Sequence, residues 1–260
     1  MRRFTALGLL ALAVVFGPLG TAHAVLNGQP DGNRHPYVGL VTDNAFVCSG
    51  SLISPTVFIT AAHCFEAPGQ QVFVTFDPDG FYGEEPSAFY AGTWYPDPNF
   101  CIACAPGLVG FDTHDVAVVI LDEALPSAVT LNQYAALPTV GYVDTLKMRT
   151  SVAVVGYGIQ DRLNKLDPGE LFTRYYAPAE LIQSNGRISG EFLKVTANPA
   201  QGKGGTCFGD SGGPILSGNT ILGVNSFVTN GNCAGVTYSY RLDTSEALAF
   251  INSIIAQYDH

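Results

Sequence analysis

The feature that most constrains the fold is a series of short apolar runs separated by turn-forming residues. The runs are rich in β-branched and aromatic side chains, and the segments between them are rich in Gly, Pro, Asn and Asp. Such runs are typical of β-strands. We expect strands at Phe46–Ile53, Val57–Thr60, Val72–Phe76, Val116–Leu121, Ser151–Val155, Thr220–Phe227 and Thr237–Leu242. Many strands at short intervals indicate an all-β sandwich or barrel, and strand content alone leaves both open.

One segment near the C-terminus has helical periodicity instead. Asp243 could cap a helix, because Glu246 follows three residues later. Apolar side chains then recur at helical spacing, at Ala247, Leu248, Ile251, Ile254, Ile255 and Tyr258. We therefore predict an amphipathic C-terminal helix within residues 243–260.

An irregular segment divides the strand-rich chain into two halves. From Glu123 to Asp144 the sequence is rich in Leu, Pro, Ala and Thr and shows no regular alternation. We expect a first domain over 25–130, a connection over 131–146 and a second domain over 147–242.

The first 24 residues differ from the rest. Arg2 and Arg3 precede an apolar run from Ala6 to Phe16, and the segment ends in Ala22-His23-Ala24. This pattern predicts a signal peptide over 1–24, because the run is too short to cross a bilayer of about 30 Å. An uncleaved anchor is the alternative. Export to an extracellular or periplasmic compartment, which is oxidising, implies that the six cysteines pair.

Composition and charge exclude several classes of protein. Hydrophobic residues make up 47% of the chain and charged residues 13%, which does not fit a disordered protein. The formal net charge is -10. Because nucleic acids and anionic membranes are bound through clustered Lys and Arg, we expect neither as a partner once the signal peptide is removed.

Three short strings carry chemically useful residues in the order His, Asp, Ser. They are Thr60-Ala61-Ala62-His63-Cys64, His114-Asp115-Val116-Ala117-Val118 and Gly209-Asp210-Ser211-Gly212-Gly213-Pro214. A serine hydroxyl is a weak nucleophile unless a base takes its proton, and that base needs a carboxylate to fix its tautomer. Each string alone is more often structural, but together they supply all three groups.

The pattern Gly209-x-Ser211-x-Gly213 also fits the nucleophile elbow of the α/β hydrolases. In that fold the acid and the histidine follow the serine, and strands alternate with helices. Here His260 is the only histidine after Ser211, and the sequence predicts no helices between its strands. A lipase or esterase is therefore rejected.

The strings and their surroundings resemble the chymotrypsin/trypsin family of serine proteases. The similarity includes Cys48-Ser49-Gly50-Ser51-Leu52-Ile53 ahead of the His63 string, and Gly156-Tyr157-Gly158, where the family usually has Gly-Trp-Gly. It covers essentially all of residues 25–260. It implies an all-β fold of two antiparallel six-stranded barrels with a C-terminal helix. It also implies a secreted serine endopeptidase that cleaves protein or peptide substrates without a cofactor, which we expect to be a monomer.

The resemblance also assigns roles to individual residues. It makes Ser211 the nucleophile, His63 the general base and then acid, and Asp115 the carboxylate that orients His63. The backbone N–H groups of Gly209 and Ser211 would form the oxyanion hole, and Ser226 would support the buried aspartate. The alternative is a catalytically silent relative that serves as a binding or adhesion module. The presence of all three triad residues favours the enzyme.

The start of the mature chain carries a second expectation. Val25-Leu26-Asn27-Gly28 approximates the Ile-Val-Gly-Gly-like sequence at which the resembling family frees an α-amine. We hypothesise that signal peptidase itself frees Val25, whose ammonium then pairs with Asp210. Alternatively, Val25 simply begins the first strand, or a propeptide sets the terminus.

The resemblance and the compartment together suggest how the cysteines pair. Cys48 with Cys64, and Cys207 with Cys233, would match the disulfides of the family. The remaining Cys-x-x-Cys could be half of a zinc site or a redox pair, but no second Cys/His pair stands near it. We expect a local disulfide between Cys101 and Cys104.

Three positions define the expected specificity pocket by the resemblance. Gly205 stands at its base, where trypsin-like members carry an aspartate, and Val228 and Gly235 stand on its walls. We therefore expect cleavage after small or medium apolar residues, with a chymotrypsin-like preference as the second choice. Selectivity should be loose, because one methylene changes transition-state binding by only about 1–3 kcal/mol.

A set of acidic residues lies where some relatives bind calcium: Glu66, Asp77, Asp79, Glu84 and Glu85. Their oxygens could hold Ca²⁺, which takes six to eight such ligands. A solvated acidic loop is the commoner meaning of this pattern, so we expect no metal and no cofactor.

Overall fold

The computed structural model describes residues 25, 27–79, 88–104, 112–159, 172–182, 190–229 and 231–259. The predicted signal peptide, Glu84, Glu85 and His260 lie outside these residues. Within them, no helix is both long and apolar enough to cross a membrane.

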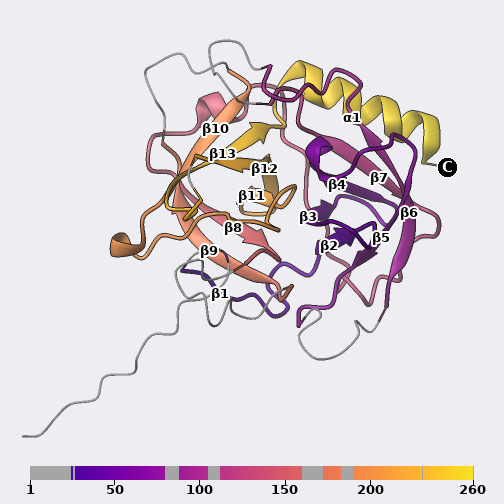
Figure 1. The fold of residues 1–260 in the computed structure, drawn as a ribbon, viewed down its shortest axis with the longest axis horizontal. Coiled ribbons are helices and arrows are strands. Elements are labelled where there is room, and N and C mark those ends of the chain that lie inside the picture. The colour runs from indigo at the N-terminus through magenta and orange to yellow at the C-terminus, as the bar shows by residue number, and fades with distance from the viewer. Residues whose placement is uncertain are drawn as a thin grey trace, which may run out of the picture.

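Six antiparallel strands of the first half close into a barrel (Figure 1). They are β2 (Val38–Thr42), β3 (Val47–Leu52), β4 (Val57–Thr60), β5 (Gln71–Thr75), β6 (Tyr90–Pro96) and β7 (Ala117–Leu121), in the spatial order β2-β3-β4-β7-β6-β5. Their inward side chains form a closely packed core. At Gly50 a Cβ atom would lie 2.3 Å from the Phe58 ring, so only glycine fits there.

The second half forms a seven-stranded antiparallel sheet. Its strands are β1 (Gln29–Pro30), β8 (Ser151–Gly156), β9 (Tyr175–Glu180), β10 (Phe192–Ala197), β11 (Pro214–Ser217), β12 (Thr220–Val228) and β13 (Gly235–Arg241), in the order β1-β9-β8-β11-β12-β13-β10. An isolated bridge between Leu181 and Val195 draws the end of β9 towards β10. The second unit is therefore a sheet curled towards a barrel rather than a complete six-stranded barrel.

The N-terminal segment belongs to the second unit, although the predicted first domain covers 25–130. Strand β1 pairs with β9, and Val25 lies in the apolar core of the second sheet. The predicted connection, 131–146, holds no strand of either sheet and contains the short 3₁₀ helix η2 (Val143–Thr145).

One α-helix, α1 (Ser245–Tyr258), follows the last strand and packs against β7 of the first barrel (Figure 1). The expectation that Asp243 caps it is wrong. Thr244 is the cap, and its side chain accepts a hydrogen bond from Ala247 N at 3.1 Å. Asp243 is buried instead, where it accepts from Val143 N at 2.8 Å and pairs with Arg241.

A buried arginine joins the two units. Arg174 is fully buried, and its Nε donates to Asp31 Oδ2 at 3.1 Å. Its Nη1 donates to Val38 O in β2 at 2.8 Å and to the Tyr157 hydroxyl at 3.0 Å. These charge-assisted hydrogen bonds hold the barrel against the sheet and so fix the seam on which the candidate site lies.

Candidate active site

The barrel topology places His63 and Asp115 at the same edge. Strand β4 pairs with β7, so that Thr60 lies opposite Ala117. His63 lies in the 3₁₀ helix η1 (Ala62–Cys64), just after β4, and Asp115 lies just before β7. Because antiparallel neighbours bring the end of one strand to the start of the other, residues 52 positions apart become adjacent.

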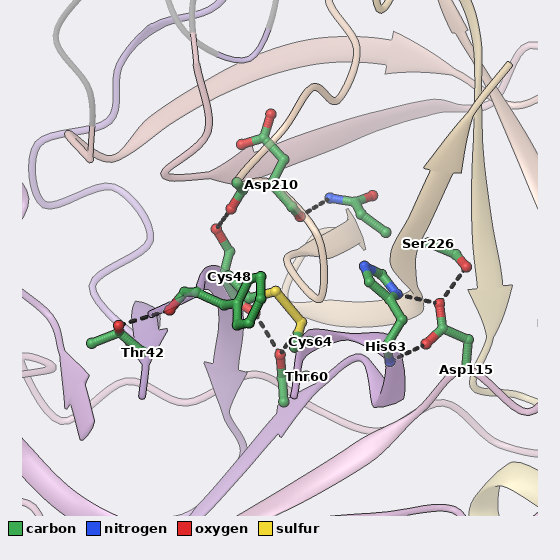
Figure 2. The surroundings of a disulfide bond; sticks show 12 residues. Thr42, Cys48, Thr60, His63, Cys64, Asp115, Asp210 and Ser226 are labelled. Carbon is green, nitrogen blue, oxygen red and sulfur yellow. Dashed lines mark hydrogen bonds and ion pairs between the residues drawn. A yellow bond between two sulfur atoms is a disulfide. The ribbon is translucent and has the colours of Figure 1, made fainter. Parts of the chain in front are cut away.

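The two side chains make a tight pair (Figure 2). His63 Nδ1 lies 2.8 Å from Asp115 Oδ2, and the His63 backbone N–H donates to Oδ1 at 3.0 Å. Ser226, from β12 of the second sheet, donates its hydroxyl to Oδ2. Asp115 is fully buried, whereas the His63 side chain is 24% exposed. The carboxylate therefore holds the ring so that Nε2 remains free of this contact.

The environment shifts the pKa of both groups in opposite directions. Burial alone would raise the pKa of Asp115, but the charge and hydrogen bond of His63, together with the Ser226 hydroxyl, bring it below its ordinary value. Burial alone would lower the pKa of His63, but the charge and hydrogen bond of Asp115 raise it above 6.5. The pair thus favours the charged form of each partner.

A second carboxylate, Asp112, stands beside this pair. One of its oxygens lies within 4.8 Å of a His63 ring nitrogen and of an Asp115 oxygen. Ala103 N, between the two cysteines of the 101–104 loop, donates to its Oδ1 at 2.8 Å. Burial and the charge of Asp115 raise the pKa of Asp112. Sequence reasoning missed Asp112, because nothing in its local string marks it.

Replacing Asp112 with Asn should lower the pKa of His63, because the variant removes a negative charge that favours the imidazolium. NMR titration of the His63 ring protons measures this shift. Asp122→Asn, an exposed change elsewhere on the barrel, should leave the titration in place. A His63 pKa that is unchanged or raised in Asp112→Asn would contradict this account.

The Ser211 loop belongs to the second sheet but is held by the first barrel. Ser49 N donates to Ser211 O at 2.7 Å, and Ser49 Oγ donates to Gly209 O at 2.9 Å. A Cβ atom on Gly212 would lie 2.2 Å from Thr60 Oγ1, so this close approach requires glycine. Ser49 therefore joins the first barrel to the Ser211 loop, and the sequence alone did not single it out.

The same loop presents backbone donors. Gly209 has a φ of 95°, in the left-handed region that favours glycine. Its carbonyl is taken by Ser49, and among the described residues neither Gly209 N nor Ser211 N has a hydrogen-bond partner. Two free N–H groups flanking Asp210 are therefore available for an anionic oxygen.

His63 and Ser211 line one cleft of about 530 Å³, which we call the main cleft. No hydrogen bond joins the two side chains among the described contacts. Of the three expected pocket residues, Val228 lines this cleft, whereas Gly205 and Gly235 do not. Its other described lining residues are Thr206, Cys207, Phe208, Asn225, Ser226, Phe227, Thr229 and Gly231. No carboxylate is among them.

Asp210, next to Ser211, is fully buried. It accepts hydrogen bonds from Gly158 N at 2.9 Å and Cys207 N at 2.8 Å, and no cation pairs with it within the described part of the chain. Burial outweighs these two bonds and raises its pKa to about 7. Val25 is buried in the second sheet with a φ of 43°, and its nitrogen is here part of the peptide bond to Ala24.

All six cysteines pair as expected, in the disulfides Cys48–Cys64, Cys101–Cys104 and Cys207–Cys233. The first joins β3 to η1 directly beside His63 (Figure 2).

Among the described acidic residues, Glu66, Asp77 and Asp79 form no cluster suited to a metal ion.

Comparison with known proteins identifies the family. The family model described as Trypsin matches residues 26–251. The chain belongs to the trypsin family. Brachyurin of Leptuca pugilator is 29% identical over 224 residues, which cover 83% of this chain and 88% of that protein. Neutrophil elastase of Mus musculus is 24% identical over 265 residues, covering 98% and 91%.

Solved structures show the same fold. Human heparin binding protein superposes with a TM-score of 0.67 at 18% identity, covering 88% of this chain and 96% of that chain. At 18% identity, this structural likeness shows a shared fold only.

Proposed function

We propose that this protein is a secreted serine endopeptidase that cleaves peptide bonds through an acyl-enzyme. The observation that carries the proposal is the pair of His63 and the buried Asp115, supported by Ser226, with His63 lining the cleft that Ser211 also lines. In the proposal, Ser211 is the nucleophile, His63 is the base and Asp115 is the carboxylate that orients the base. The trypsin family of its relatives agrees with this chemistry.

In the proposed mechanism, His63 Nε2 takes the proton of Ser211 Oγ as this oxygen attacks the substrate carbonyl carbon. Asp115 stabilises the imidazolium that results. The imidazolium then gives its proton to the leaving amine as the C–N bond breaks, which leaves an acyl group on Ser211. Water, deprotonated by His63, then attacks the acyl carbon, and His63 returns this proton to Ser211 Oγ as the acid is released. Catalytic hydrogen bonds often tighten only when substrate binds, so the absence of a Ser211–His63 bond among the described contacts agrees with this sequence of steps.

Gly209 N and Ser211 N would stabilise the negative oxygen of each tetrahedral intermediate. Such donors contribute a few kcal/mol each, because they need no reorganisation during the reaction. The reaction requires no metal or other cofactor.

The main cleft supports cleavage after small or medium apolar residues. Val228 lines it, and no described lining residue carries the carboxylate that a substrate Arg or Lys would need there. Thr206 adds a hydroxyl at the cleft, bonded to Thr237 at 3.0 Å. Efficient cleavage after Arg or Lys would contradict this specificity.

A signal peptide over residues 1–24 would direct export, and its removal by signal peptidase would free the Val25 amine. The buried, unpaired Asp210 is the partner proposed for that ammonium. The positive φ of Val25, unfavourable for a β-branched residue, is a local strain that a freed terminus could relieve. The mature protein would act as a monomer on protein or peptide substrates.

A fluorophosphonate probe tests the proposal directly, because it labels only an activated serine. We expect the mature protein to be labelled stoichiometrically and Ser211→Ala to remain unlabelled. Ser217→Ala, outside the main cleft, is the matched control and should be labelled like the parent. An unreactive mature protein starting at Val25 would refute the enzyme.

The second candidate is a catalytically silent binding module. A structural relative is named for heparin binding. Heparin is a polyanion, however, and a chain with a net charge of -10 would repel it. Heparin binding therefore does not support the hypothesis of a catalytically silent binding module.

A further inference from the structure

A second cleft, of about 610 Å³, shares His63 in its lining with the main cleft. We call it the Trp94 cleft. Its described walls come from β6 and the loop after it, which carries the Cys101–Cys104 disulfide, from the segment around His63, and from Phe46. Because His63 lines both clefts, a peptide bound in the main cleft has residues close to this one.

The lining of the Trp94 cleft combines apolar surface with negative charge. Phe46 and Ile102 are 54% and 71% exposed, and they offer apolar surface at its edges. Glu66 and Asp97 are the carboxylates in its lining, and no Lys or Arg is among the described lining residues. Apolar walls with carboxylates match a long side chain that ends in a cation.

Two buried polar groups at this cleft have unmet bonding capacity. Asp97 is 4% exposed, and its Oδ1 accepts from Asn99 N and Nδ2 at 2.9 and 3.2 Å. No described residue donates to its Oδ2. Trp94 is 1% exposed, and its indole N–H lacks a hydrogen-bond partner among the described residues. Buried polar groups are normally bonded. The buried carboxylate of Asp97 favours a cationic partner, whereas the Trp94 N–H, which is a donor, needs an acceptor such as a carbonyl oxygen of the bound peptide.

We propose that the Trp94 cleft binds a lysine or arginine side chain of the substrate, close to the scissile bond. The stem lies against Phe46 and Ile102, and the cation lies beside Glu66 and Asp97. This inference rests on the proposed function and refines its substrate class: an apolar residue in the main cleft and a basic residue nearby along the peptide. The net charge of -10 also attracts such basic substrates.

Binding can be measured without catalysis, because Trp94 is the only tryptophan in the chain. Inactive Ser211→Ala protein is titrated with peptides that place Lys, or the neutral isostere norleucine, at each of the three positions on either side of a fixed alanine. We expect one position at which Lys binds about tenfold more tightly and changes the Trp94 fluorescence. Added salt should reduce this advantage.

Charge variants separate the cleft from general attraction. Glu66 is exposed, so Glu66→Gln should fold normally and reduce the Lys advantage to about threefold, the range of a partly exposed ion pair. Asp97→Asn should reduce it further. Glu123→Gln, an exposed change outside the cleft, should keep it. Equal binding of Lys and norleucine at every position, or a full Lys advantage in Glu66→Gln, would overturn the proposal.

The two proposals fail in different ways. If the mature protein reacts with fluorophosphonate but shows no preference for Lys, only the assignment of the Trp94 cleft is wrong. If the mature protein does not react, the proposed protease activity is wrong, and the cleft cannot be a protease subsite.

Discussion

Asp115→Asn is expected to lower kcat by about 10⁴-fold. The His63 backbone N–H already donates to Oδ1 of Asp115, so the amide nitrogen of the substituted side chain would take the place of Oδ2 beside the ring. An amide N–H donor there forces Nδ1 to accept and leaves the proton on Nε2. The ring then cannot take the proton of Ser211. Steady-state cleavage of an alanine-containing peptide measures the loss.

Two further variants show whether the tautomer is the cause. Ser226→Ala removes the other hydrogen bond to Asp115 Oδ2 but keeps the carboxylate, so its loss should be much smaller. Asp122→Asn, an exposed change, should have no effect. If Asp115→Asn retained more than a tenth of the parent activity, His63 would not depend on this carboxylate.

Extending the mature chain by one residue, so that it starts at Ala24, should lower activity by about 10²- to 10³-fold. The Val25 nitrogen would then be an amide, and Asp210 would lose its proposed cation. Removing one partner of a buried ion pair costs about 3–5 kcal/mol. Asp210 lies between Gly209 and Ser211. We therefore expect the loss of its cation to destabilise the arrangement of their backbone N–H groups, which are the proposed oxyanion donors. Peptide cleavage by proteins with the two defined N-termini measures the effect.

The same pair of proteins should differ in how stability depends on pH. Without a cation, the folded-state pKa of Asp210, about 7, lies above its ordinary value of 3.8. The extended protein should therefore lose stability as pH rises from about 4 to 7, because unfolding releases a proton that the folded state keeps. The protein starting at Val25 should not show this loss. Equal activity and equal urea profiles at pH 5 and 8 would contradict the ion pair.

Strands were predictable where a short segment of the sequence is strongly apolar. All seven expected strands exist within two residues of their predicted ends, and β4 matches at both ends. Six other strands of the described chain were missed. Strand β9 contains Pro178 and ends at Glu180, and β1 is only two residues long. Such segments become strands because a partner supplies the hydrogen bonds, and the partner lies far away in the sequence.

The helix end shows the same limit on a smaller scale. Asp243 and Thr244 are both residues that cap helices, and the sequence favoured the first because of the spacing to Glu246. In the fold, the Asp243 carboxylate accepts hydrogen bonds from the Arg241 side chain and from Val143 N, so Thr244 caps the helix instead. A tertiary ion pair therefore moved the cap by one residue.

By itself, the sequence determined the chemical groups of the candidate site and the family. His63, Asp115 and Ser211 lie in strings whose residue types carry the chemistry, and such strings can be read locally. Only the tertiary structure decided that Asp112 stands beside His63, that Ser49 holds the Ser211 loop and that a second cleft opens at Trp94. These neighbours are joined by strand pairing and by the packing of two units, and distance in space between remote residues is not encoded in any local pattern.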